Sequence, residues 1–236
     1  MKKLAASFVL ILMVVNAFAQ SDSKLHFGLK AAPSLAWMRS DSKDFESDGS
    51  RFGFIYGLVT EFNFADHYAF ATGIDITYRG GKSKSIITNV VRNTANTADS
   101  ITSTSTFSTT YSIQYIELPL TLKLKTNEIG YLTYYLQAGV APGINIRARL
   151  KYSSTTQTTI GGTTLTSSDE DSGINIKENI NNLNFSMIIG GGIEYTISGS
   201  TVLLAGIQFN NGFLDVFDSD IKVNSNYLAL TIAVLF

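Results

Sequence analysis

The stretch from Tyr115 to Lys125 alternates strictly between two kinds of side chain. Its apolar positions are Ile116, Leu118, Leu120, Leu122 and Leu124, and the positions between them are Glu117, Pro119, Thr121, Lys123 and Lys125. Successive side chains of an extended strand point to opposite faces, so this period of two predicts a β-strand with one apolar face. That face needs a hydrocarbon-like neighbour, while the charges opposite need water or partners. A soluble sheet on a core and a membrane barrel with a polar lumen both meet these requirements.

The first 19 residues have the three parts of a secretory signal peptide. Met1-Lys2-Lys3 supplies positive charge, Leu4 to Val15 supplies an apolar run, and Ala17-Phe18-Ala19 supplies small residues for cleavage. We therefore expect export, cleavage near Ala19 and one barrel domain over residues 20–236. No later apolar run approaches the roughly 20 residues that a membrane-spanning helix needs. The sequence has no cysteine, which excludes disulfides and a lipid-modified cysteine.

Composition narrows the possible surroundings of the mature chain. Charged residues make up 16% of the sequence, below the roughly 25% usual for soluble domains. This deficit indicates that much of the surface does not face water. Without the two lysines of the signal peptide, 16 basic residues stand against 19 acidic ones. No dense basic stripe is present, so we expect no nucleic-acid partner.

The alternation recurs along the whole mature chain. Predicted strands cover about residues 25–36, 52–64, 68–79, 111–125, 132–149, 183–195, 201–214 and 223–236. The links between them are alternately long and short, as expected for up-and-down strands with tight turns at one end of a barrel. We interpret the Ser/Thr-rich stretches 80–110 and 151–181 as long polar loops. Within 111–125 the apolar positions change from odd to even, which predicts a bulge near Tyr115 or Ile116.

The last strand separates a membrane barrel from a soluble eight-stranded calyx. One face carries Leu228, Leu230, Ile232, Val234 and Phe236, and the other carries Tyr227, Ala229, Thr231, Ala233 and Leu235. Neither face is charged, although a soluble barrel would expose one of them to water. The aromatic C-terminal residue, Phe236, resembles the assembly signal of Gram-negative outer-membrane barrels. We therefore predict an all-β, eight-stranded antiparallel up-and-down transmembrane β-barrel in the cell outer membrane. Its expected partners are outer-membrane lipid and the assembly machinery.

One segment of the chain also resembles a known family. The run Tyr115-Ile116-Glu117-Leu118-Pro119-Leu120-Thr121-Leu122-Lys123 is similar to the PorT-like family of small outer-membrane β-barrels of Bacteroidetes. Phe27-Gly28-Leu29-Lys30, Gly73-Ile74 before Tyr78, Gln137-Ala138-Gly139 and the terminal strand extend the resemblance over the mature chain. The resemblance implies a barrel in the outer membrane, and the founding member links the family to secretion by the type IX pathway.

The interior of an eight-stranded barrel is just wide enough for side chains to fill it. Inward charges should therefore pair into a network and not line a pore. The predicted lumen network comprises Lys30, Glu61, Asp75, Arg79, Glu117, Lys123, Arg147, Arg149 and Glu194, with His26 and Lys125 on the same inner faces. Removing one partner of a buried pair can cost roughly 3–5 kcal/mol. We expect this network to specify closure of the barrel.

The sequence gives little support for enzymatic chemistry. Its two histidines, His26 and His67, both fall near the tight turns. No nucleophile elbow, phosphate loop or pair of histidine ligands is present, so we predict no enzyme, no cofactor and no metal site. We interpret Asp169-Glu170-Asp171 as part of a solvated loop. A structural or interaction barrel with an unidentified extracellular partner is the favoured function. A transport component for small solutes or secreted proteins is the alternative.

Overall fold

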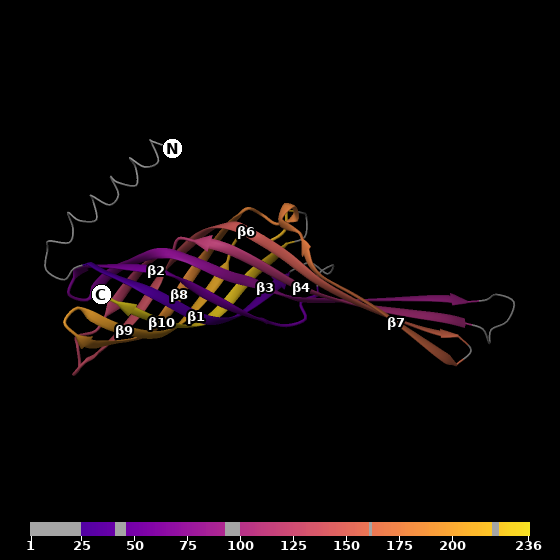
Figure 1. The fold of residues 1–236 in the computed structure, drawn as a ribbon, viewed down its shortest axis with the longest axis horizontal. Coiled ribbons are helices and arrows are strands. Elements are labelled where there is room, and N and C mark those ends of the chain that lie inside the picture. Colours follow the sequence, from indigo (N-terminus) through magenta and orange to yellow (C-terminus); the bar gives the residue numbers. More distant parts are fainter. Residues whose placement is uncertain (1–24, 41–45, 93–99, 161, 219–221) are drawn as a thin grey trace.

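The computed structural model describes residues 25–40, 46–92, 100–160, 162–218 and 222–236, so the expected signal peptide lies outside the described residues. The chain forms an antiparallel sheet that closes on itself as a barrel (Figure 1). Its strands are β1 (Leu25–Ser40), β2 (Arg51–Ala65), β3 (Tyr68–Arg92), β4 (Ser100–Glu117), β5 (Leu120–Lys125), β6 (Leu132–Ile160), β7 (Thr163–Asn175), β8 (Leu183–Ser198), β9 (Thr201–Gly212) and β10 (Val223–Leu235). A short 3₁₀ helix, η1 (Lys177–Asn179), precedes β8.

The ring of the barrel has eight strand positions, which confirms the predicted fold. β4 and β5 occupy one position in succession, because both pair with β3 and β6 on either side of the break at Leu118-Pro119. β7 pairs with β6 alone among the strands. The first and last strands close the ring, and the Phe27 amide donates to the Phe236 carbonyl at 3.1 Å. The reciprocal bond, from the Phe236 amide, measures 2.7 Å.

The outer face of the barrel is apolar on every strand. Leu29, Leu58, Leu136 and Leu230 are more than half exposed, although apolar side chains of this size are usually buried in soluble domains. Inward positions carry polar, charged and small residues. This division matches a barrel surrounded by lipid with a polar interior. Among the described residues, no helix is long and apolar enough to span a membrane.

The bulge predicted near Tyr115 or Ile116 is present at this position, but the extra residue is on β6 and not on β4. Ile113, Tyr115 and Glu117 are all buried, so the inward face of β4 stays on odd positions without a change of phase. The change of register lies across the strand pair, in β6. There Tyr115 pairs with Asn145, but Gln114 pairs with Arg147. The extra residue in β6 moves its inward face from odd positions such as Asn145 to even positions such as Ala148. In β4 the apolar Ile113 and Tyr115 simply point into the barrel.

Those inward apolar residues close one end of the interior. Met38, Ile113, Tyr115, Ala148, Ile180, Val216 and Val223 form a buried cluster, which we call the apolar plug. The loop segments on either side of η1 and before β10 complete it. Backbone bonds from Asn181 to Val216 at 2.9 Å and from Val216 to Val223 at 2.7 Å hold these segments over the barrel end. The apolar plug lies at the end opposite the tight turns.

The two long stretches interpreted as polar loops are largely β-strands. β3, β4, β6 and β7 continue beyond the barrel as a single-layer sheet, which we call the arm (Figure 1). It comprises residues 82–92, 100–110, 151–160 and 163–172. Threonine is β-branched and favours extended backbone, which explains why these sequences form strands. Cross-strand hydroxyl contacts support the arm, with Ser105 to Thr156 at 2.9 Å and Thr159 to Thr164 at 3.0 Å.

Candidate functional site

Eight charged side chains of the described barrel interior form ion pairs, and their formal charges cancel. Four are acidic and four are basic: Glu61, Asp75, Glu117 and Glu194, and Lys30, Arg79, Lys123 and Lys125. Each comes from an inward position of a barrel strand, and each lies within ion-pair distance of an opposite charge. A buried charge is tolerated when it is paired and hydrogen-bonded. Strand alternation therefore places apolar side chains against lipid on the outer face and paired charges on the inner face.

Four of these residues form a compact group near the tight turns, which we call the Lys123 group. Lys123 contacts Glu61 and lies 2.6 Å from Glu194. Lys125 contacts the same two carboxylates, with 2.8 Å between its Nζ and Glu194 Oε2. The Lys123 ammonium also lies 4.4 Å from the centre of the Tyr135 ring, a cation–π distance. Two carboxylates and two ammonium groups thus close this end of the interior.

A separate pair lies between this group and the other end. Lys30 Nζ is 2.5 Å from Asp75 Oδ2. The two residues come from different strands, β1 and β3. Their ion pair therefore joins strands that β2 separates in the ring. The pair passes over Gly57 of β2, on the rung that the three residues share.

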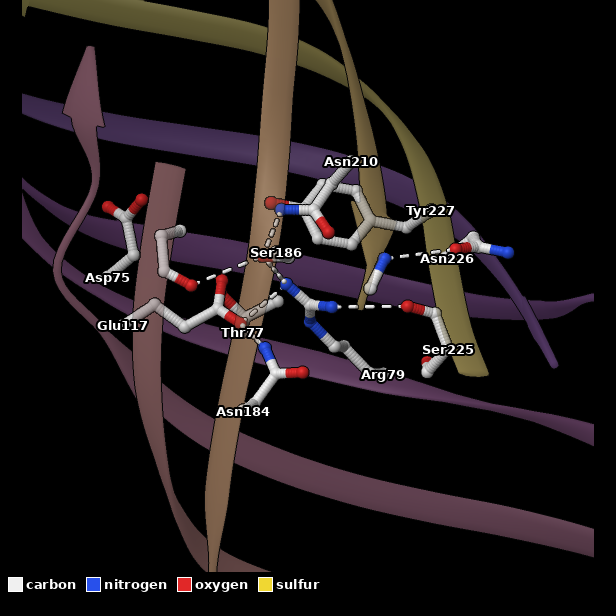
Figure 2. A network of polar contacts seen from close by, with 12 residues as sticks. Asp75, Thr77, Arg79, Glu117, Asn184, Ser186, Asn210, Ser225, Asn226 and Tyr227 are labelled. Carbon is white, nitrogen blue, oxygen red and sulfur yellow. Dashed lines mark hydrogen bonds and ion pairs between the residues drawn. The ribbon is translucent and has the colours of Figure 1, made fainter. Parts of the chain in front are cut away.

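Arg79 is the centre of the third group, drawn in Figure 2. Its guanidinium is fully buried and lies 2.6 Å from Glu117 Oε1. The same nitrogen donates to Ser186 Oγ at 3.1 Å, and the other terminal nitrogen donates to the Ser225 carbonyl at 3.3 Å. The Tyr227 ring lies 4.8 Å from the guanidinium carbon. One side chain of β3 therefore binds groups on β4, β8 and β10.

Glu117 has its own set of donors beside Arg79. The Thr77 hydroxyl donates to Oε2 at 3.0 Å and the Asn184 amide donates to Oε1 at 3.3 Å. Two strands, β3 and β8, thus supply the groups that contact this carboxylate of β4. Hydrogen bonds that involve an ionised partner are roughly twice as strong as neutral ones. The arrangement fixes the Glu117 side chain in one orientation across the lumen (Figure 2).

The prediction that Arg147 and Arg149 face the lumen is wrong. Both side chains are exposed, and the small residue between them, Ala148, is buried. The register shift after Asn145 is the physical cause, because one extra residue in β6 exchanges the two faces of everything beyond it. The other seven predicted network residues lie inside the barrel, as the pairs Lys30–Asp75 and Arg79–Glu117 and the trio Lys123, Glu61 and Glu194.

The interior leaves little free space. A cavity of about 40 Å³ lies in the barrel, lined in part by Lys30, Thr121, Lys123, Tyr135 and Gln208. That volume holds one or a few water molecules. The apolar plug and the Lys123 group stand at the two ends of the interior. Within the described residues, side chains therefore occupy the lumen between the Lys123 group and the apolar plug.

Neither end of the molecule shows the geometry of a metal site. Among the described residues, no group of three His, Cys, Asp or Glu side chains is placed to hold an ion. Asp169-Glu170-Asp171 is not a loop but part of β7, where successive side chains point to opposite faces. Glu170 instead contacts Lys151 on the neighbouring strand, and both of these side chains are exposed.

The comparisons agree with this architecture. A model of the family described as outer membrane protein beta-barrel domain matches residues 18–218. The chain belongs to this family. Membership places this outer-membrane β-barrel in the lipid bilayer of the outer membrane. A comparison with curated protein sequences found no match.

Several solved structures resemble the fold of this family member. Neisserial surface protein A is 16% identical, with 89% of this chain and 97% of that chain covered and a TM-score of 0.43. The attachment invasion locus protein Ail of Yersinia pestis is 12% identical, with 89% and 98% covered and a TM-score of 0.37. OprG of Pseudomonas aeruginosa is 10% identical, with 90% and 95% covered and a TM-score of 0.38. These likenesses concern the fold alone.

Sequence reasoning missed the neutral members of the Arg79 group. Thr77, Ser186 and Asn210 are fully buried, and Asn210 donates to Ser186 Oγ at 2.9 Å. The signal that could have found them is their place on inward positions of β3, β8 and β9. Polar residues there need hydrogen-bond partners as much as charges do.

Proposed function

We propose that this outer-membrane β-barrel is a non-enzymatic interaction protein, with a closed barrel as its anchor and the arm as its working surface outside the cell. The single observation that carries the proposal is the contrast between the two parts. The interior is occupied by paired charges, whereas the arm exposes both faces of a sheet. Loops and extensions on a rigid scaffold are the usual carriers of binding function.

The orientation follows from the lengths of the connections. The tight links after β2, β5 and β8 lie at one end of the barrel, with the C-terminal residue Phe236 beside them (Figure 1). Outer-membrane barrels have short periplasmic turns and longer extracellular segments. The arm and the apolar plug are at the opposite end, which we assign to the cell exterior.

Cysteine labelling of intact cells tests this orientation. The chain has no cysteine of its own, so each substitution gives a single reporter. Ser168→Cys in the arm is expected to react with a membrane-impermeant maleimide, whereas Asn127→Cys in a tight link is expected to react only after the outer membrane is opened. Equal labelling of both variants in intact cells would contradict the assigned orientation.

Conductance of the purified protein in a planar bilayer is a second test of the proposed function. We expect no stable open-channel conductance, because the charge pairs and the apolar plug fill the interior. The alternative function is transport of small solutes or of secreted proteins, as the PorT-like resemblance implies. Reproducible conductance of the folded barrel would support that alternative and overturn the anchor proposal.

We further propose that Phe236 is read by the outer-membrane assembly machinery. Its side chain is exposed on the outer face, and its backbone forms the last pair of the β1–β10 seam. Phe236→Ala is expected to reduce the amount of folded, heat-modifiable barrel in the membrane severalfold. Phe64→Ala, which removes another exposed aromatic ring near the tight turns, is the matched control. Equal amounts of the two variants in outer-membrane fractions would refute this role.

A further inference from the structure

The arm has two outer edges, and they differ in how they are protected. On one side β7 carries Asp169-Glu170-Asp171 in its part nearer the barrel, where charges on an edge strand oppose pairing, whereas its outer part, Thr163 to Ser168, has no charge. On the other side β3 reads Ser85-Ile86-Ile87-Thr88-Asn89-Val90-Val91, which contains no charge. The four apolar residues of this segment are between 48% and 64% exposed. A long, flat, apolar edge is a ready site for pairing with another strand.

The free part of the β3 edge begins just beyond Lys84. Up to that point the segment 46–49 covers it, since Asp48 donates to the Lys82 carbonyl at 2.8 Å and Lys84 donates to the Glu46 carbonyl at 3.1 Å. Beyond it, β3 pairs with β4 alone among the described residues. Because Lys82 and Lys84 direct their amides away from β4, the strand period places the amides of Ile86, Thr88 and Val90 on the free edge as well.

We propose that the free β3 edge binds the β7 edge of a second copy of this chain, so that the arms of neighbouring barrels join into one continuous sheet. The inference rests on the proposed function only in requiring the arms to stand on the same side of the membrane. β3 runs away from the barrel and β7 runs back toward it (Figure 1). Copies inserted in one orientation therefore present these edges to each other antiparallel, the more favourable arrangement.

The register of the arm shows that the two edges match in height. The pairings across the sheet run from Thr88 through Thr104 and Gln157 to Thr166. They likewise connect Val90 to Thr164. Barrels at equal depth in the membrane thus place β-branched and hydroxyl residues of one edge beside hydroxyl residues of the other. Such side chains suit cross-strand contact on a pleated surface.

Charge and strand direction favour one of the possible pairings of edges. The free edge from Ile86 to Val90 lies on the same rungs as Ser168 to Thr164 of β7, and neither run carries a charge, so a β3–β7 contact opposes no like charges. A β3–β3 contact within one membrane would be parallel, the less favourable arrangement. A β7–β7 contact would oppose the acidic triplets. Like charges directly opposite each other are destabilising.

The proposed contact is heterologous, because different edges of the two copies meet. Each copy keeps one edge of each kind free for a further neighbour, so the contact builds rings or open rows in the membrane. This consequence distinguishes it from a two-fold dimer.

Disulfide trapping between copies tests the proposal in outer membranes. Val90→Cys and Thr164→Cys are expressed together as separate chains, and mild oxidation is expected to give a covalent dimer. The same two residues within one arm are three strand spacings apart, about 14 Å, too far for a disulfide. A chain that carries both cysteines is expected to give a ladder of higher multimers. Val90→Cys paired with Asn127→Cys at the tight-turn end serves as the negative control.

A proline on the free edge tests whether backbone pairing holds the copies together. Thr88→Pro, in the trapping background, removes an amide from the free edge and leaves the β3–β4 ladder intact. It is expected to lower dimer yield at least tenfold while the barrel remains heat-modifiable, whereas the matched Thr88→Val variant cross-links as before. Undiminished trapping of the proline variant would overturn edge pairing.

Three other results would overturn the choice of a second copy bound through β7. The first is that folded, surface-labelled Val90→Cys and Thr164→Cys chains form no covalent dimer. The second is that Val90→Cys alone gives the same dimer yield. The third is that the cysteines cross-link only to a different protein. The orientation proposal is tested separately by Ser168→Cys labelling. A labelled arm without trapped dimers would refute this inference and leave the proposed function standing.

Discussion

Glu117→Ala is expected to lower the free energy of unfolding of the barrel by about 3–5 kcal/mol, the usual cost of breaking a buried ion pair. The substitution leaves the Arg79 guanidinium fully buried with its closest anion removed. It also removes the acceptor of the Thr77 hydroxyl and the Asn184 amide. Ser186 and the Ser225 carbonyl remain, but neither carries a compensating charge.

Urea unfolding midpoints in detergent or lipid vesicles measure this effect. Glu170→Ala is the matched control, because it removes a carboxylate from an ion pair whose partners are exposed on the arm. Exposed pairs contribute about 0–1 kcal/mol. If both variants unfolded at the same urea concentration, Glu117 would not be the buried partner of Arg79.

A paired substitution separates the cost of an orphaned charge from the cost of lost packing. Arg79→Met in the Glu117→Leu background removes both charges and retains much of the side-chain volume. Replacing a whole buried pair is often close to neutral. The double variant is therefore expected to be more stable than Glu117→Ala, and a further loss of stability would contradict the orphaned-charge explanation.

Lys123→Met is expected to have an effect of similar size, about 3–5 kcal/mol, at the other end of the interior. Lys123 contacts Glu61 and Glu194 at once, so its loss leaves two buried carboxylates with Lys125 as their shared cation. It also removes the cation from the face of the Tyr135 ring. The ion-pair loss dominates, because cation–π contacts contribute about 0.5–2 kcal/mol.

The measurement is the temperature at which the folded gel band disappears on heating. Lys151→Met provides the control, since it removes a lysine from the exposed pair with Glu170. The Lys123 variant is expected to lose the folded band at a clearly lower temperature. Indistinguishable temperatures would show that the Lys123 group does not hold the tight-turn end of the barrel together.

Strand periodicity predicted the barrel because every strand is constrained on two sides at once. Lipid requires apolar residues outside and a narrow interior requires small or paired polar residues inside, which produces the alternation read at 116–124. The same rule placed Lys30, Glu61 and Glu194 correctly inside. It failed at Arg147 and Arg149, where one inserted residue exchanges the faces. The strand that carries a bulge cannot be identified from the sequence when both of its faces contain apolar and polar residues.

Neither the strands of the arm nor the partners within the lumen could be predicted from the sequence, for different reasons. Composition in 80–110 and 151–181 resembled a loop, although threonine-rich backbone also extends readily once a neighbouring strand offers hydrogen bonds. Partner choice within the lumen depends on how far each strand is staggered around the ring. Lys123, for example, reaches Glu194 on β8 and not the nearer-in-sequence Glu117. That stagger is a property of the closed barrel.

The continuity of β3 from the barrel into the arm gives the protein a mechanical character. β3 has 25 residues, which corresponds to about 80 Å of extended chain assigned as one strand. A pull on the tip of the arm acts along the strands, so it loads their hydrogen bonds in shear and shares the force among many bonds. The paired length of β4, 18 residues against β3, carries that load down into the membrane-embedded wall. The arm and the barrel wall are therefore expected to resist a pull together, through the backbone hydrogen bonds between β3 and β4.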